Sequence, residues 1–136
     1  MPIAADLLEV ERAIQLAIAP AFLLTACVTT LNLLTLRLNR IIDRGLAPDN
    51  QTPARQAMLT RRATLMRAAI STATVAAILI SLLVTAGFAG VFLAMPLGIL
   101  VGLLLLGGMA ALIATFVLFL AEIRLARVQQ SSPEAP

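Results

Sequence analysis

The sequence has no histidine, tryptophan or tyrosine, a single cysteine, and only 12 % charged residues among its 136. Histidine is the side chain most used in acid–base catalysis and metal binding, and one cysteine cannot form an intrachain disulfide. The long apolar stretches contain no acidic residue, which counts against a pump that works through intramembrane carboxylates. The sequence therefore predicts no enzymatic activity: no catalytic residue, no metal site and no cofactor.

Two long stretches, 13–36 and 68–121, contain no charged residue at all. Hydrophobic residues make up 60 % of the chain, whereas a soluble domain has about 45–50 %. Because about 20 apolar residues cross a bilayer, the first stretch holds one span and the second holds two. We predict an all-α integral membrane protein with three transmembrane helices in a single membrane domain, residues 1–128. The spans are expected at about 13–36, 68–88 and 97–121, followed by a disordered tail at 129–136.

The first helix is predicted to continue past the membrane edge. Arg37, Arg40 and Arg44 follow the first apolar stretch at helical spacing, and Gly45 with Pro48 is typical of a helix end. This helix is therefore expected to end near Arg44, beyond the hydrocarbon core.

A second helix is predicted to begin after a short connection, with Thr52 as the N-cap and Pro53 as the first helical residue. Helices over about 13–44 and 53–87 are each roughly 50 Å long, whereas a bilayer core is about 30 Å thick. An arginine-rich helical hairpin formed by residues 37–67 is therefore expected to project into the cytoplasm.

Apolar residues from Ile3 to Ile14 recur on one helical face, which predicts a short N-terminal amphipathic helix in the outer membrane interface. The same pattern also fits the start of the first span. Pro20 has no amide hydrogen to donate within a helix, so a kink is expected there, joining an in-plane helix to a spanning one.

The arginines lie mainly on one side of the predicted topology. Seven of the ten are in 37–67, two follow the last span, one precedes the first, and none lies in the predicted turn containing Gly87, Gly90, Pro96 and Gly98. Because basic residues concentrate on the cytoplasmic side, we predict an inner-membrane protein with its N-terminus outside and its C-terminus in the cytoplasm. Arginines that flank spans favour anionic lipid headgroups as partners and make nucleic acid an unlikely one.

Polar residues recur along one face of the second helix in alternating steps of four and three. This α-helical polar seam comprises Thr60, Thr64, Arg67, Ser71, Thr74, Ser81 and Thr85, with Ile78 at the remaining position. A shorter seam on the first span comprises Thr25, Thr29, Asn32 and Asn39. Two interpretations stay open: hydroxyl residues allow helices to pack closely, or the seams face water along a permeation path. Asn32 is the most informative residue, because an unpaired amide in lipid is costly and must meet protein or water.

Small residues form a stripe on the third span that is typical of close helix packing. The stripe contains Gly98 and Gly102 as a GxxxG motif, followed by Gly107, Ala111 and Ala114. Three spans with this many packing faces predict self-association or association with another membrane subunit.

Charged residues at the inner edge of the spans are expected to pair. Glu122 directly follows the third span, at the depth where Arg37 ends the first and Arg67 begins the second. We predict that Glu122 bonds Arg67 or Arg37. Asp43 lies between Arg40 and Arg44 and is predicted to reach Arg55 or Arg62 across the hairpin; the alternative is that these charges are solvated and contribute little.

Three segments resemble a known family: Ile14–Thr25, Leu36–Arg44 and Phe119–Ala126. The strings Ala-Pro-x-Phe-Leu-Leu and Arg-x-x-Arg-Ile-Ile-Asp-Arg are similar to those of the bacterial "domain of unknown function 2721" family. The resemblance covers roughly residues 10–127 and implies a three-span inner-membrane protein without implying an activity. It also implies that the family pattern includes Pro20, Arg37, Arg40, Asp43, Arg44 and Glu122.

Two functions are compatible with the sequence. The first is a homo-oligomer whose polar seams line a path for a small solute or ion, with the arginines at its inner mouth favouring anions. The second is a non-catalytic accessory or scaffold subunit of a larger membrane complex, in which the seams only pack and the hairpin docks on an acidic partner or anionic lipid.

Overall fold

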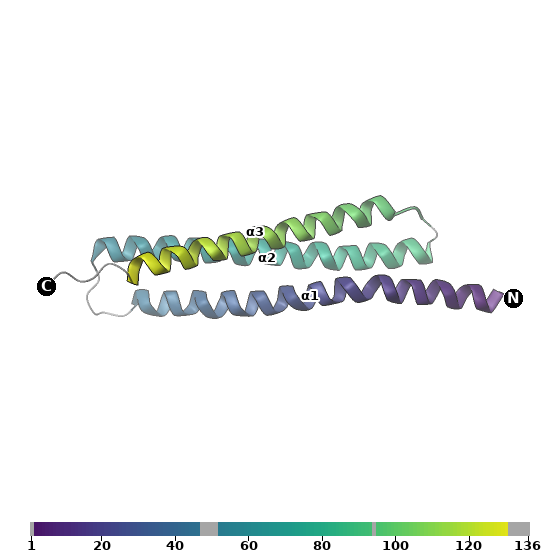
Figure 1. The fold of residues 1–136 in the computed structure, drawn as a ribbon, viewed down its shortest axis with the longest axis horizontal. Coiled ribbons are helices and arrows are strands. Elements are labelled where there is room, and N and C mark those ends of the chain that lie inside the picture. Colours follow the sequence, from purple (N-terminus) through teal and green to yellow (C-terminus); the bar gives the residue numbers. More distant parts are fainter. Residues whose placement is uncertain (1, 47–51, 94, 131–136) are drawn as a thin grey trace.

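The chain forms three long helices. The structure, a computed structural model, describes residues 2–46, 52–93 and 95–130. Within them, helix α1 is Pro2–Leu46, α2 is Pro53–Phe92 and α3 is Gly98–Gln130 (Figure 1). All three are long and apolar enough to cross a membrane, which confirms the predicted all-α fold with three candidate spans.

Helix α2 lies between the other two and packs against both, with α1 and α3 running antiparallel to it (Figure 1). The start of α1 extends beyond the α2–α3 turn, and residues 7–12 are exposed. We call the opposite end, where α1 ends, α2 begins and α3 ends, the hairpin end. There α1 also reaches α3, through side chains described below.

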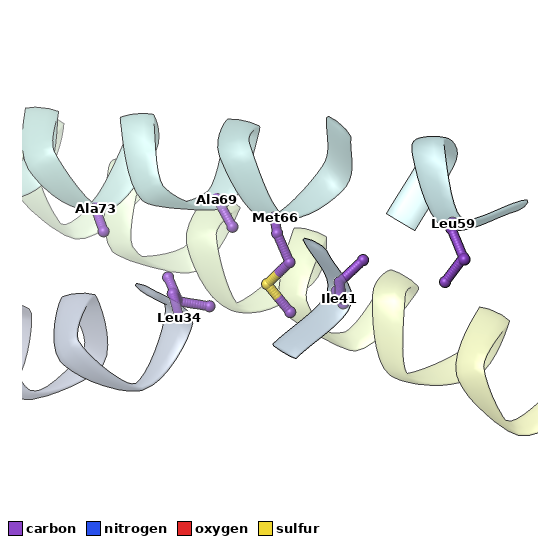
Figure 2. Packing of buried hydrophobic residues seen from close by; sticks show 6 residues of the cluster. All are labelled: Leu34, Ile41, Leu59, Met66, Ala69 and Ala73. Atoms are coloured by element: carbon purple, nitrogen blue, oxygen red, sulfur yellow. The ribbon is translucent and has the colours of Figure 1, made fainter. Parts of the chain in front are cut away.

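The contact between α1 and α2 follows a seven-residue repeat. The buried residues of α1 are Pro20, Cys27, Leu34 and Ile41. The buried residues of α2 form two interleaved series with the same period, namely Leu59, Met66, Ala73 and Ile80, and Arg62, Ala69, Ala76 and Leu83. Figure 2 shows Leu34 and Ile41 facing Met66 and its neighbours. A period of 3.5 residues keeps one stripe on the partner along the whole contact, as in a coiled coil.

The contact between α2 and α3 depends on glycines. At Gly108 an added Cβ would lie 3.1 Å from Ile80 Cγ1, and at Gly107 it would lie 3.3 Å from Leu79 Cδ1. A side chain at either position would therefore force the facing side chain of α2 to shift, most of all at Gly108. In contrast, an added Cβ at Gly98 or Gly102 would meet no atom within 4 Å.

The predicted small-residue stripe is therefore divided between two environments. Gly107, Ala111 and Ala114 are partly buried toward the bundle, whereas Gly98 and Gly102 are exposed. Gly108, which the predicted stripe omitted, makes the tightest approach because it lies one helical step from Gly107, on the side that faces α2.

The beginning of α2 agrees with the sequence-based prediction. Thr52 is the N-cap, with extended backbone (φ −71°, ψ 146°), and Pro53 follows it. The Thr52 side chain makes no capping bond; instead its carbonyl oxygen accepts the amides of Arg55 at 3.0 Å and Gln56 at 3.1 Å.

The helix ends differ from the prediction at several points. Residues 3–14 are not a separate helix, because α1 continues unbroken through Pro20 (Figure 1). Gly87 and Gly90 lie inside α2, which ends at Phe92, since a long apolar helix tolerates glycine where no turn is required. Pro48 and residues 131–136 lie outside the described residues, whereas Gln129 and Gln130, which the prediction placed in a disordered tail at 129–136, are helical.

Replacing Gly108 with leucine is expected to destabilise the bundle by about 1–3 kcal/mol, because the side chain would overlap Ile80. Gly102→Leu is the matched control and should cost nothing, since its surroundings are open. Unfolding of monomeric protein in mixed detergent and denaturant measures both. Equal stability of the two variants would contradict the packing described for Gly108.

Candidate functional site

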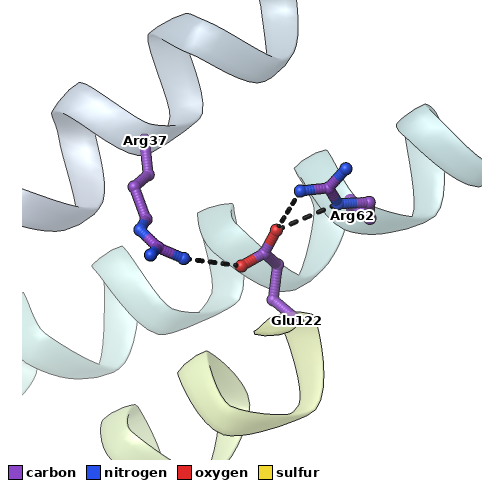
Figure 3. A network of polar contacts seen from close by, with 3 residues as sticks. All are labelled: Arg37, Arg62 and Glu122. Atoms are coloured by element: carbon purple, nitrogen blue, oxygen red, sulfur yellow. Dashed lines mark hydrogen bonds and ion pairs between the residues drawn. The ribbon is translucent and has the colours of Figure 1, made fainter. Parts of the chain in front are cut away.

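Glu122 is the centre of an ionic network at the hairpin end. The residue is 1 % exposed. One of its carboxylate oxygens accepts hydrogen bonds from Nε and Nη2 of Arg62, at 2.9 and 2.7 Å. Its other oxygen accepts Nη1 of Arg37 at 3.4 Å. Figure 3 shows the carboxylate of α3 held between an arginine of α2 and an arginine of α1. The network therefore ties all three helices together at one level.

The two arginines have different surroundings. The Arg62 side chain is 10 % exposed and lies in the buried repeat of α2, at a position otherwise held by alanine or leucine. The Arg37 side chain is 43 % exposed, and its guanidinium lies 4.9 Å from the centre of the Phe119 ring. A cation over an aromatic face is stabilised by the ring electrons, which orients Arg37 toward α3.

The predicted partners of Glu122 were Arg67 or Arg37, and the structure pairs it with Arg37 and Arg62. Arg67 is exposed on the opposite face of α2. Arg67 was predicted from its depth in the membrane. The contact depends instead on the helix face, because Arg62 lies on the same buried face of α2 as Met66 and Ala69, and Arg67 does not. That seven-residue spacing is the signal from which Arg62 could have been found.

The other predicted members of the charge cluster lie around this network. Arg40 and Arg44 are exposed and, together with Arg37, Arg62 and Glu122, line a cavity of about 230 Å³. Asp43 is exposed, and within the described part of the chain no ion pair joins it to Arg55 or Arg62.

The polar seam of α2 faces away from both neighbouring helices. Ser71, Thr74, Ser81 and Thr85 are all exposed. The hydroxyls of Thr74, Ser81 and Thr85 donate to the carbonyls four residues earlier at 2.9, 2.8 and 3.0 Å. Such bonds satisfy a hydroxyl in an apolar environment without a second helix.

The seam of α1 also faces outward, on the side opposite its contact with α2. Thr25 and Thr29 are exposed and donate to their own backbone at 3.1 and 2.9 Å. Asn32 is exposed as well, and no hydrogen bond of its amide occurs within the described residues. The structure therefore does not bring the two seams together within one chain.

A polar contact between α2 and α3 was not predicted. The hydroxyls of Thr72 and Thr115 lie 2.9 Å apart, and Thr115 is fully buried. Gly108, Thr115 and Glu122 are all buried and follow one another at intervals of seven residues on α3. The buried face of α3 therefore has the same period as the buried faces of α1 and α2. Among the described residues, no three His, Cys, Asp or Glu side chains form a group that could hold a metal ion.

Comparison with known proteins agrees with the resemblance seen in the sequence. The sequence model of a family described as "Protein of unknown function (DUF2721)" matches residues 17–130. The matched region includes Pro20, the arginines of the network and Glu122. Neither a curated protein nor a solved structure matches the chain.

Removing the charge of Glu122 is expected to destabilise the protein by about 3–5 kcal/mol, because Glu122→Gln breaks the buried ion pair with Arg62. Arg67→Gln is the control and should change stability by no more than about 0.5 kcal/mol, since Arg67 is exposed. The measurement is the free energy of unfolding in detergent.

A second substitution sharpens the test. Adding Arg62→Met to Glu122→Gln should recover part of the lost stability, since an apolar side chain needs no counter-ion in that position. Additive losses in the double variant would show that the two residues do not interact.

Proposed function

The chain belongs to the DUF2721 family, whose proteins have unknown function, and we propose that it forms a homo-oligomer whose polar seams face a water-filled path across the membrane. The path would serve a small solute or ion. We further propose that the membrane is the bacterial inner membrane, with the N-terminus outside and the hairpin end in the cytoplasm. The concentration of arginines at that end supports this orientation.

The exposed amide of Asn32 is the observation that carries the proposal. The residue lies within the charge-free stretch 13–36 and on the outer face of α1. An amide without a partner is costly in hydrocarbon, and no other described residue bonds it. A neighbouring copy of the chain or a column of water would each provide the missing bonds.

The positions of the two seams favour a closed ring. The α1 seam and the α2 seam lie on different outer faces of the same protomer. An arrangement in which the α1 seam of one copy faces the α2 seam of the next across water is head-to-tail, and its repetition can close into a ring. Hydroxyls that bond their own backbone keep a lone pair for water, which suits a wetted lining.

The arginines at the hairpin end would set the selectivity of such a path. Arg40, Arg44 and Arg67 are exposed at the level where the apolar stretches end. A ring of several copies would repeat these charges around the mouth and attract anions.

An accessory subunit of a larger membrane complex is the second candidate function. It is favoured by the open surroundings of Gly98 and Gly102, which leave a shallow face on α3 where another helix could approach closely. In that case the seams would pack against other proteins, and no path would form.

Native mass spectrometry of the protein extracted in mild detergent separates the two candidates. A ring predicts one closed homo-oligomeric mass containing only this chain. Attached subunits of other mass would favour the accessory role, and a bare monomer would contradict both proposals.

Thiol labelling tests whether the seam is wetted. Asn32→Cys, Thr74→Cys and Ser81→Cys are expected to react with a water-soluble maleimide in reconstituted membranes. Native Cys27 is fully buried, so the unmodified protein should stay unlabelled.

Ile113→Cys is the matched control for Thr74→Cys. The bond between Thr72 and Thr115 places positions 74 and 113 at similar depth on antiparallel helices, and Ile113 is 60 % exposed on the apolar face of α3. It should stay unlabelled. Protection of all three seam positions would rule out a water-filled path along the seam.

A further inference from the structure

The cavity at the hairpin end is lined mainly by positively charged side chains. It has a volume of about 230 Å³, and its lining includes Arg37, Arg40, Arg44, Arg62 and Glu122. Four arginines and one glutamate thus line the same cavity, and two of the arginines, Arg37 and Arg62, bond the carboxylate. The arrangement is unlike a scattered set of surface charges, because Arg62 is buried and Arg37 is held over an aromatic ring.

The negative charge of Glu122 is already paired with two arginines. Both of its oxygens accept hydrogen bonds, one from Arg62 and the other from Arg37. Arg40 and Arg44 have no ion pair within the described part of the chain. They are four residues apart on one face of α1, and like charges at that spacing repel each other. An anion between them would relieve this repulsion.

We propose that this cavity binds the phosphate group of an anionic phospholipid headgroup. Phosphate presents several acceptor oxygens around one centre, and guanidinium groups donate to such oxygens in pairs. In this site Arg40 and Arg44 contact the phosphate directly, while the Glu122 network holds the floor of the cavity in place. The proposal goes beyond the permeation path and does not depend on it.

The depth of the cavity supports a lipid as the source of the phosphate. The charge-free stretches end at Arg37 on α1 and at Glu122 on α3, which marks the edge of the hydrocarbon. At 1.5 Å per residue, Arg40 and Arg44 lie about 5 and about 10 Å beyond Arg37. Headgroups occupy about 5–8 Å on each side of the core, so Arg40 lies at the level of the lipid headgroups and Arg44 lies about one helical turn beyond it.

Lipid titration followed by native mass spectrometry tests the site. Dioleoyl phosphatidylglycerol is added to the full-length protein in detergent, with phosphatidylcholine as the zwitterionic reference, and inorganic phosphate is titrated separately. Arg40→Gln with Arg44→Gln is expected to weaken phosphatidylglycerol binding about 10-fold. Both residues are exposed, so folding should persist; if the double variant does not accumulate, Arg40→Gln alone should weaken binding about 3-fold.

Arg55→Gln with Arg61→Gln is the matched control. Both arginines are exposed at the same end of the bundle and lie outside the cavity, and the loss of charge is the same. This variant should weaken binding less than 2-fold. An equal loss in both double variants would overturn the proposal in favour of diffuse attraction, and so would a loss in neither.

The inorganic phosphate titration distinguishes the source of the group. One outcome would make the lipid assignment wrong: phosphatidylglycerol binds equally to every variant, but inorganic phosphate binds the unmodified protein and not the variant with Arg40→Gln and Arg44→Gln. The site would then bind free phosphate. If the lipid is lost selectively, the lipid assignment stands.

Discussion

A buried carboxylate at the edge of the apolar region constrains how the three helices fit together. Glu122 is almost completely buried, and an ion in that position is tolerated only when its charge and its lone pairs are matched. Arg62 and Arg37 provide the match from two different helices. Sliding any helix by one turn, about 5.4 Å, would break these bonds, so the network defines one longitudinal register.

The apolar packing between the network and the far end of the bundle is compatible with this register, because its buried residues follow a regular seven-residue repeat. Buried side chains recur every seven residues on α1 and α2, from Ile41 and Leu59 at the hairpin end to Cys27 and Ile80 farther along. Lipid provides little hydrophobic force between helices, so close contact and hydrogen bonds must stabilise the bundle. Gly108 provides the close contact, and the bond between Thr72 and Thr115 adds the polar one.

Composition and length were sufficient to predict the three helices, because charge-free stretches of this length have few other folds available. The start of α2 at Thr52 and Pro53 could also be predicted from the sequence, since threonine is favoured at the N-cap and proline at the first helical position. The partner of Glu122 was only half predicted. To choose between Arg62 and Arg67, one must know which face of α2 is buried. That face is hard to recognise in the sequence, because alanine occupies many of its positions. The environment of the seams could not be predicted, since it depends on which helix face the neighbours cover.

Polar groups in this protein divide by the side of the helix on which they lie. Those that face inward are bonded between helices, as in Glu122 with Arg62 and Thr72 with Thr115. Those that face outward mostly bond their own backbone, as Thr74 and Ser81 do. Asn32 cannot satisfy a whole amide in that way, and Arg40 and Arg44 make no ion pair within the described part of the chain. The incompletely bonded groups on the outer faces therefore point to what lies outside a single chain, such as another copy, water or a headgroup phosphate.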